Sequence, residues 1–236
     1  MPTREEAKEI RRNRILKAAR DLIRETEKTR FSMRMLAERS GVSLVTPYNL
    51  FGSKQAIMGA LLDEDMNVYG RNLARSRKDP LDRIFHAVTL GIRYFGQDEG
   101  YYRAVLSAVY ADTGSDEYRT KFGRPRLALW RSLVNDAIDK GFLRQDTVTR
   151  VLAYHLSNNF YSNILPWAAG QISLEELEQR TIYGFALSLF ATVRPAHQAR
   201  MRERASNAQD VLVQLREKAR ARSETGIRKA NGTNAP

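Results

Sequence analysis

Polar side chains that can bind a phosphate or the edge of a base are concentrated in one short segment of the chain. Ser32 and Tyr48 carry hydroxyl groups, Asn49 carries an amide, and Lys54 carries an ammonium group at the start of a predicted helix. Hydroxyl groups, ammonium groups and the N–H groups of a helix N-terminus bind phosphate oxygens, and an asparagine amide can pair with adenine. These residue types therefore favour contact with nucleic acid.

Residues suited to catalysis or metal binding are not grouped in the sequence. The chain has no cysteine, and its three histidines, His86, His155 and His197, are far apart and lack the spacing of zinc ligands. The sequence also lacks a glycine-rich phosphate loop and a nucleophile elbow. We therefore expect no enzyme activity, no catalytic residue, no metal and no cofactor. Turnover of a substrate would contradict this expectation.

The charge of the chain is strongly positive and unevenly distributed. The formal net charge is +12, to which residues 1–78 contribute +7, residues 79–193 contribute −1 and residues 194–236 contribute +6. A basic soluble protein most often meets nucleic acid or an anionic membrane surface, although the same asymmetry can serve solubility alone. The first residues lack the apolar core of a secretory signal, and the most apolar stretch, residues 185–193, is too short to span a bilayer. We therefore expect a cytoplasmic protein without a membrane partner.

Capping residues and a glycine divide the first part of the chain into predicted helices. After a long amphipathic helix, Ser32 can cap a short helix that Gly41 ends, Ser43 can cap a second short helix, and Ser53 can cap a longer third. Two short helices joined by a tight glycine turn are typical of a helix-turn-helix motif, whose second helix lies in the major groove. Here that helix is expected at residues 44–51. The alternative is a helical corner in an all-α core.

The second short helix carries the residues that we expect to read base edges. Its first residues, Leu44, Val45 and Thr46, are small or apolar and can contact thymine methyl groups. Asn49 can reach an adenine edge, and Tyr48 is placed to hold a phosphate.

The same segment resembles the DNA-binding domain of the tetracycline-repressor family, the TetR-like transcriptional regulators. The run ILKAARDLIRE before the segment resembles that family's first helix. Within the segment, the residues at the family's spacing are Ser32, Ala37-Glu38, Gly41-Val42-Ser43, Tyr48, Phe51 and Lys54. The resemblance covers only the N-terminal part of the chain, and the rest is similar only in length and helical plan.

This resemblance implies a bacterial, homodimeric repressor that binds an operator of two-fold character and that a small molecule releases. It implies that Tyr48 and Lys54 contact phosphates, whereas Leu36, Val42 and Phe51 belong to the core of the domain. The residues expected at the DNA are Ser32, Met33, Arg34, Ser43, Leu44, Val45, Thr46, Pro47, Tyr48, Asn49 and Lys54.

Two residues depart from the pattern of that family. Val45 stands where many members have glycine, and Pro47 stands where they have an aliphatic residue. If Ser43 caps the helix, Pro47 is its fourth residue, lacks the first intrahelical N–H donor and disfavours a helical Thr46. We therefore expect the recognition helix to start late or to open with a distorted turn. A regular helix from Leu44 onward would contradict this expectation.

Apolar residues at helical spacing continue beyond this segment, and no stretch has the alternation of a strand. Asp79 before Pro80, and Ser173 with Glu176, mark two further helix starts. The expected fold is all-α, with an N-terminal three-helix helix-turn-helix domain and a larger C-terminal helical bundle. The expected parts are a DNA-binding domain at 1–53, a connecting helix at 54–78, a ligand-binding and dimerisation domain at 79–193, an extra basic helix at 194–222 and a disordered tail at 223–236.

The central part of the chain is rich in aromatic residues, most of which belong in the core of a bundle. A ligand site in such a bundle is mostly apolar with a few polar groups. His155 and Asn159 are the best polar candidates because they lie one turn apart on an otherwise apolar stripe, and Phe85 and Trp130 can line the same site. We therefore expect an apolar or aromatic effector, although a lone histidine on such a stripe is more often a core residue.

A row of small residues on the helix expected at about 174–193 allows another helix to approach closely. The resemblance places the subunit contact on this helix and on the helix before it, at about 147–169. The expected interface residues are Thr181, Gly184, Phe185, Ser188, Leu189 and Thr192. The alternative is that both faces pack within one subunit.

The sequence leaves open a DNA-binding protein of the same fold that has no small-molecule inducer. Such a protein would respond to a protein partner or act as an activator. The operator, the effector and the regulated genes are not encoded in any motif of the chain.

Overall fold

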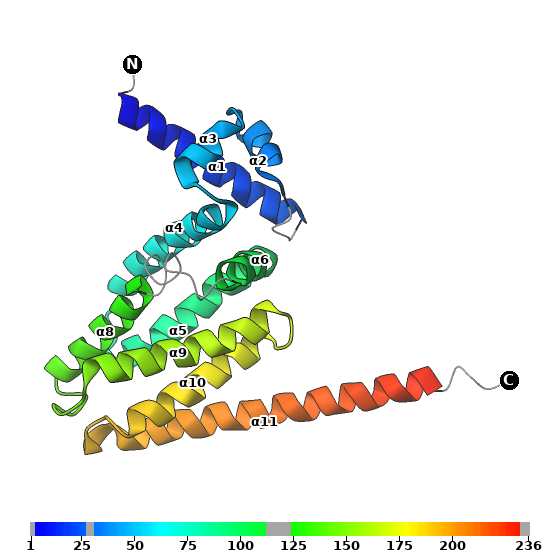
Figure 1. Cartoon of the computed structure of the whole chain (residues 1–236). Helices are drawn as coiled ribbons and strands as arrows, with labels where there is room; N and C mark the ends of the chain where they lie inside the picture. Colours follow the sequence, from blue (N-terminus) through cyan, green and yellow to red (C-terminus); the bar gives the residue numbers. More distant parts are fainter. Residues whose placement is uncertain (1–2, 27–30, 112–123, 232–236) are drawn as a thin grey trace.

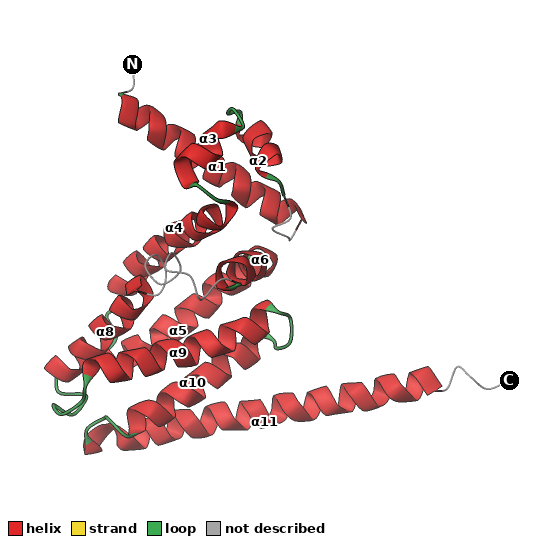
Figure 2. Ribbon diagram, in the orientation of Figure 1, coloured by secondary structure: helices red, strands yellow, loops and turns green. Residues whose placement is uncertain are grey.

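The computed structural model describes residues 3–26, 31–111 and 124–231, apart from the side chains of residues 124–125 and 222–231. Within these ranges the chain forms ten helices and no strand, and Leu143 and Val193 form an isolated antiparallel bridge. Figure 2 shows helices throughout the described structure, joined by short loops. The all-α fold predicted from the sequence is confirmed.

Three helices form a small N-terminal domain at one end of the molecule (Figure 1). They are α1 (Arg4–Thr26), α2 (Met33–Ser40) and α3 (Val45–Phe51). One face of α1 is apolar and fully buried at Ile15, Ala19 and Ile23, and Leu36 of α2 is buried in the same core. Because these α1 residues are one helical turn apart, the apolar stripe in the sequence becomes the core of this domain.

The turn between α2 and α3 is fixed by residues that the sequence pattern singles out. The Ser32 side chain accepts a hydrogen bond from the N–H of Met35 at the start of α2 (3.1 Å). Gly41 ends α2 with a φ of 64°, a left-handed conformation that favours glycine. Arg14 of α1 donates to the carbonyls of Ser40 (2.7 Å) and Gly41 (3.1 Å), which anchors the turn to α1.

Helix α4 (Lys54–Ala74) leads from this domain into a larger bundle (Figure 1). The bundle contains α5 (Pro80–Gln97), α6 (Glu99–Tyr110), α8 (Arg124–Asp139), α9 (Thr149–Ala168) and α10 (Leu174–Phe190). Helix α9 packs against α8 and α10, and α5 packs against the same two helices. The side chains of Asp79 and Ser173 cap α5 and α10 by accepting from backbone N–H groups, as their sequence positions predict.

The last helix, α11 (Pro195–Asn231), returns along α10 and then extends beyond the bundle (Figure 1). Met201 and Ala208 are buried against the bundle, whereas residues 216–221 are exposed. The sequence predicted a helix at 194–222 and a disordered tail at 223–236, but the helix continues to Asn231. Glutamate, arginine, lysine and alanine in this stretch favour helix. Residues 232–236 lie outside the described structure.

Candidate nucleic-acid interface and ligand region

The outward side of α3 carries four residues that the sequence assigned to base or phosphate contact. Val45 is 59% exposed and Tyr48 is 49% exposed, and Leu44 and Asn49 are exposed beside them. Residues at these positions share one side of a helix because they are one residue or one turn apart. Apolar side chains beside a hydroxyl and an amide form a surface that suits thymine methyl groups and base edges.

Helix α3 begins at Val45, with Leu44 as its N-cap residue and Pro47 as its third helical residue. Its first turn is tight, because the Thr46 N–H donates to the Ser43 carbonyl three residues earlier (3.0 Å). The tight turn agrees with the distorted opening expected from Pro47, whereas the start is not clearly late, because the Leu44 backbone already has helical angles (φ −54°, ψ −31°). Ser43 is not the cap, however, and its hydroxyl lies 2.8 Å from the Thr46 hydroxyl. At the third position proline removes an N–H that has no intrahelical acceptor, so no hydrogen bond is lost.

Two residues assigned to the DNA surface from the sequence pack inside the N-terminal domain. Met33 and Pro47 are buried. A buried side chain is already held by its own domain, so contact of Met33 or Pro47 with a base is not supported. Spacing placed both residues near the motif, but spacing alone does not tell which side of a short helix faces outward.

Helix α2 extends the exposed surface through Arg34 and Met35. The Arg34 guanidinium lies 3.1 Å from a carboxylate oxygen of Glu38, one turn later. Exposed ion pairs of this kind are weak, so a phosphate can compete for Arg34. Met35 is exposed too, although it is not among the residues predicted at the DNA from the sequence. Its place in the first turn of α2, next to Arg34, was the feature of the sequence that could have identified Met35 as a surface residue.

Lys54 makes contacts that differ from those expected for a phosphate-binding lysine. Its ammonium group donates to the Phe31 carbonyl (2.7 Å) and lies 4.6 Å from the centroid of the Phe31 ring. Burial lowers the pKa of Lys54 from its ordinary value. Lys54 therefore ties the segment before α2 to the start of α4, and its contact with phosphate stays a prediction.

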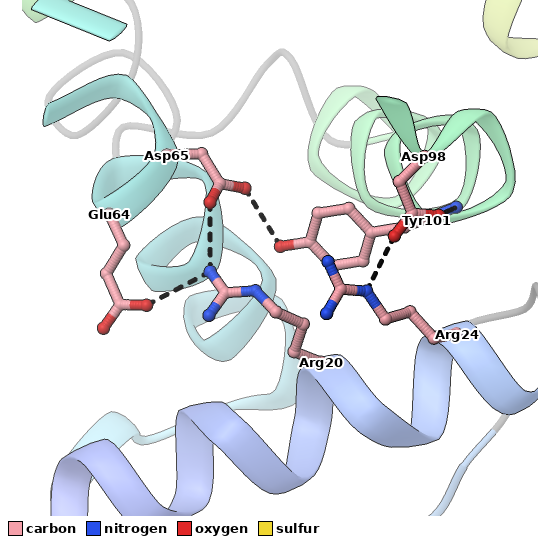
Figure 3. A network of polar contacts seen from close by, with 6 residues as sticks. All are labelled: Arg20, Arg24, Glu64, Asp65, Asp98 and Tyr101. Atoms are coloured by element: carbon pink, nitrogen blue, oxygen red, sulfur yellow. Dashed lines mark hydrogen bonds and ion pairs between the residues drawn. The ribbon is translucent and has the colours of Figure 1, made fainter. Parts of the chain in front are cut away.

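A network of polar side chains joins the N-terminal domain to α4 and α6 (Figure 3). Arg20 of α1 lies 3.2 Å from Glu64 and 3.0 Å from Asp65, both on α4. The Tyr101 hydroxyl of α6 donates to Asp65 (3.1 Å). One carboxylate thus receives hydrogen bonds from two other helices, which fixes their relative positions.

The charges in this network are shaped by burial and by one another. Burial raises the pKa of Asp65, and the Arg20 guanidinium offsets this rise only in part. Burial alone lowers the pKa of Arg20, but the surrounding Tyr101, Asp65 and Glu64 raise it above its ordinary value. This network was not predicted from the sequence, because its members come from segments far apart in the chain.

Six aromatic rings from α5, α8, α9 and α10 meet inside the bundle and form what we call the aromatic cluster. Its members are Phe85, Phe95, Trp130, Phe160, Trp167 and Phe185. Trp130 lies edge-on to Phe160 and Phe185, at centroid distances of 6.1 and 5.1 Å. Phe95 is stacked with Phe160 at 6.5 Å and with Trp167 at 5.1 Å. Both arrangements are favourable for aromatic pairs.

Three of the four predicted ligand residues lie in or beside the aromatic cluster. Phe85 and Trp130 are buried members of it. Asn159 precedes Phe160 on α9, and its amide fills the space that a Cβ at Gly184 of α10 would need. Glycine at this position therefore lets α9 and α10 approach each other closely.

His155 lies on a different surface from the cluster, and its predicted burial is wrong because the side chain is exposed. Val151, one turn earlier, is 62% exposed, and Val148 and Tyr154 are exposed nearby. Helical spacing correctly grouped His155 with apolar residues. The shared face turns outward, however, and the sequence pattern alone does not give its direction.

Of the six residues predicted at a subunit interface on and just after α10, three pack within one subunit and three are half-buried. Thr181, Phe185 and Leu189 are fully buried, and Gly184 contacts α9. The hydroxyls of Ser188 and Thr192 donate to carbonyls of their own helix, at Gly184 and Leu189. Internal packing therefore holds for Thr181, Phe185 and Leu189, whereas a subunit contact through Gly184, Ser188 and Thr192 stays a prediction. The outward side of α10 is marked instead by Leu187, which is 51% exposed.

Across residues 3–26, 31–111 and 124–231, no helix has the length and apolar character needed to cross a membrane. In the same part of the chain, no three histidine, aspartate or glutamate side chains are grouped in a way that suits a metal ion.

Comparison with known protein families finds one match within the N-terminal domain. Residues 15–61, which run from the middle of α1 into α4, match the family described as bacterial regulatory proteins, tetR family. The resemblance predicted from the sequence is confirmed by this match. Comparison with curated proteins finds no significant match.

Solved structures of similar fold include two that are described in complex with a small molecule. A TetR transcriptional regulator from Rhodococcus sp. RHA1 is 21% identical, with 78% of this chain and 98% of that chain covered and a TM-score of 0.63. RolR in complex with resorcinol is 16% identical, with 86% and 96% covered and a TM-score of 0.64. FadR of Thermus thermophilus in complex with lauroyl-CoA is 21% identical, with 75% and 93% covered and a TM-score of 0.61. At these identities the likeness is one of fold: the chain has the two-part fold of TetR-family transcriptional regulators.

Proposed function

We propose that this protein is a sequence-specific, DNA-binding transcriptional regulator of the bacterial cytoplasm. In its specific form, the proposal is a homodimeric repressor that an apolar or aromatic small molecule releases from a palindromic operator. The observation that carries it is the exposed set on α3, Leu44, Val45, Tyr48 and Asn49, within the segment that matches the tetR family. The net charge of +7 on residues 1–78 favours the approach of this surface to DNA.

A dimer follows from the two-fold character of the proposed operator, since each N-terminal domain reads one half-site. The outward faces of α9 and α10 support this part of the proposal. They expose Val151 and Tyr154 on α9, Val148 at its N-cap and Leu187 on α10. Apolar side chains gathered on the surface of a protein mark an interaction site more often than scattered ones do.

The effector is assigned to the larger bundle, where the aromatic cluster supplies an apolar interior. Structures of similar fold carry resorcinol in one case and lauroyl-CoA in another, which supports a small-molecule effector here without identifying it. Phe85, Trp130 and Asn159 remain candidates for its contact, whereas exposed His155 is no longer one.

The decisive experiment selects bound duplexes from a random DNA pool at near-physiological salt. We expect an enriched inverted repeat, because a dimer with two reading helices recognises two half-sites. Val45→Asp on α3 should lose this binding, because a carboxylate would meet the DNA. Val213→Asp is the matched control, since Val213 is an exposed valine on α11. Salt-sensitive binding with no enriched site would overturn the proposal of a sequence-specific regulator.

A further inference from the structure

The two tryptophans of the aromatic cluster each bury a hydrogen-bond donor that has no acceptor. Trp130 and Trp167 are 1% and 0% exposed, and neither indole N–H has a hydrogen-bond partner among the described residues. A buried tryptophan N–H usually finds a partner, because leaving it unpaired costs stability. Two such donors within one cluster of packed rings point to an acceptor that the described part of the chain does not supply.

Phe160 differs from the other members of the cluster because it alone of the six is only half-buried. Its ring is stacked on Phe95, with 13° between the two planes, and lies edge-on to Trp130 at 83°. On another side the ring rests against Gly91 of α5, where an added Cβ would lie 3.5 Å from it. The surroundings of this ring thus have the shape and contacts that one planar aromatic group requires.

We propose that an effector with a planar aromatic ring and a carbonyl-type oxygen takes the place of the Phe160 ring in the aromatic cluster. The ring of the effector stacks on Phe95, and its oxygen accepts a hydrogen bond from the Trp130 indole N–H. Phe160 swings toward solvent, which its partial exposure allows. This inference rests on the proposed function in that it names the chemical class of the effector.

This site costs the unliganded protein little stability, because the Phe160 ring fills the space that the effector later occupies. Without such a ring, the cluster would contain a void and lose contacts on every side. The exchange replaces one aromatic ring by another, so the stacking on Phe95 is kept. What the effector adds is the acceptor for Trp130.

The first test is an NMR titration that follows the two indole N–H resonances, since the chain contains only two tryptophans. The probes are acetophenone and α-methylstyrene, which have the same shape and differ only by an oxygen in place of a CH₂ group. We expect acetophenone to shift the Trp130 resonance downfield, as a new hydrogen bond does, and α-methylstyrene to leave it without that shift. Trp130→Phe and Trp167→Phe assign the two resonances. If acetophenone moves neither resonance, or only that of Trp167, the proposal is wrong.

The second test substitutes Phe160, whose ring competes with the effector, and Trp130, whose indole N–H binds it. Phe160→Ala should bind acetophenone about tenfold more tightly, because the competing ring is gone and the binding-competent state is always present. Trp130→Phe should weaken the binding of acetophenone by roughly three- to tenfold, which corresponds to the loss of one hydrogen bond, and should leave the affinity for α-methylstyrene unchanged. Phe142→Ala is the matched control, since Phe142 is a half-buried ring that stacks on His197 outside the cluster.

Unchanged or weaker acetophenone binding by folded Phe160→Ala would overturn the displacement of this ring. If that variant does not fold, Phe160→Leu and the titration of the unaltered protein decide the question. Release of the selected operator duplex is measured separately. Acetophenone that binds at Trp130 without releasing DNA leaves this site in place and removes the ligand response from the proposed function. If acetophenone does not shift the Trp130 indole resonance while the protein still binds the operator duplex, this site is wrong and the proposed DNA-binding function stands.

Discussion

At the scale of single residues, α3 divides its exposed side chains between two kinds of contact. The Asn49 amide has a donor and an acceptor and can match the edge of one base, whereas the Tyr48 hydroxyl suits a phosphate of any sequence. Both are exposed on the same side of α3. Their substitutions should therefore have different signatures, even though the residues are neighbours.

We predict that Asn49→Ala relaxes the preference for one base pair of the operator. The loss of a base-specific contact is worth about 1–3 kcal/mol at that position. Tyr48→Phe should instead weaken every duplex alike, because it removes a contact that carries no sequence information. Titration of the operator and its single-base variants measures both effects. Equal loss for all duplexes with Asn49→Ala would remove Asn49 from base reading.

Lys54 is predicted to stabilise the N-terminal domain through its bond to Phe31. Replacement by methionine keeps the aliphatic stem but removes the donor, so the Phe31 carbonyl loses a charged partner. We expect Lys54→Met to lower the free energy of unfolding by about 1–3 kcal/mol. Lys17→Met is the control, because Lys17 is exposed and forms its ion pair with Asp21, one turn away on the same helix.

Denaturation in urea measures this change, and the salt dependence of DNA binding tests the alternative role. If Lys54 contacts a phosphate, its loss reduces the slope of log affinity against log salt by about one. An unchanged stability together with a reduced slope would show that the phosphate contact, and not the bond to Phe31, is the function of this lysine.

At the scale of helices, the boundaries were predicted from the sequence better than the faces were. Ser32, Ser53, Asp79 and Ser173 each cap a helix in the structure as predicted. A cap is a local interaction between residues three apart, so the sequence contains all of it. The direction in which an apolar stripe turns depends instead on the packing of distant helices. For that reason the face of α9 that contains His155 was assigned to the interior when it lies outside.

The link between α1, α4 and α6 gives the protein a pH dependence whose sign follows from Asp65. Its pKa is raised above the ordinary value of 3.8, mainly by burial, so the folded protein binds this proton more readily than the unfolded chain does. The contribution of Asp65 to stability is therefore complete below pH 3.8 and is lost as the pH rises through the folded-state pKa. Asn at this position cannot ionise but still accepts from Tyr101.

We predict that Asp65→Asn removes this part of the pH dependence. Over the range from pH 3.8 upward through the folded-state pKa, the stability of the unaltered protein should fall relative to that of the variant. Urea denaturation at a series of pH values measures the difference between the two proteins. Asp21→Asn, on the exposed side of α1, should follow the unaltered protein. A constant difference at every pH would mean that Asp65 titrates alike in both states.

Two arginines of α11 hold this helix on the bundle by pairing with aspartates at the N-terminus of α5. Arg200 donates to Asp79 (3.0 Å), Arg204 donates to Asp82, and the Arg204 guanidinium lies 4.3 Å from the centroid of Phe85. Since Phe85 belongs to the aromatic cluster, α11 covers one end of it.

We predict that Arg204→Ala lowers the free energy of unfolding by about 1–3 kcal/mol, because Asp82 loses a charged partner and Phe85 loses its cover. Arg216→Ala on the exposed part of the same helix should change it by less than about 0.5 kcal/mol. Thermal or urea denaturation of the two variants makes the comparison. Equal effects would mean that α11 adds nothing to the bundle at this point.

At the scale of the whole molecule, the polar network and the aromatic cluster form one continuous set of contacts. Tyr101 of the network lies edge-on to Tyr102 at 5.0 Å, and Tyr102 contacts Phe95 of the cluster at 5.3 Å. A displacement of a ring at Phe95 can thus be passed through contacting side chains to Asp65 and Arg20, and from there to α1. Spatial continuity makes coupling between the effector and the DNA-binding domain testable, although only a measured change in affinity establishes it.

The assembly of two chains is the last step that the proposed function requires, and the outward face of α9 and α10 is the place to break it. Val151→Glu and Leu187→Arg each put a charge on an exposed apolar side chain, so neither should disturb the fold of one subunit. In a dimer both charges would be buried without a partner, which costs several kcal/mol.

Light scattering should then give 27.0 kDa for the variants and twice that mass for the unaltered protein and for Val213→Glu, an equally apolar exposed site on α11. Because one N-terminal domain alone reads one half-site, affinity for the inverted repeat should fall about a hundredfold or more with dimer loss. Variants that remain dimeric would place the contact on another face, and an unaltered protein that is monomeric at micromolar concentration would remove the dimer from the proposal.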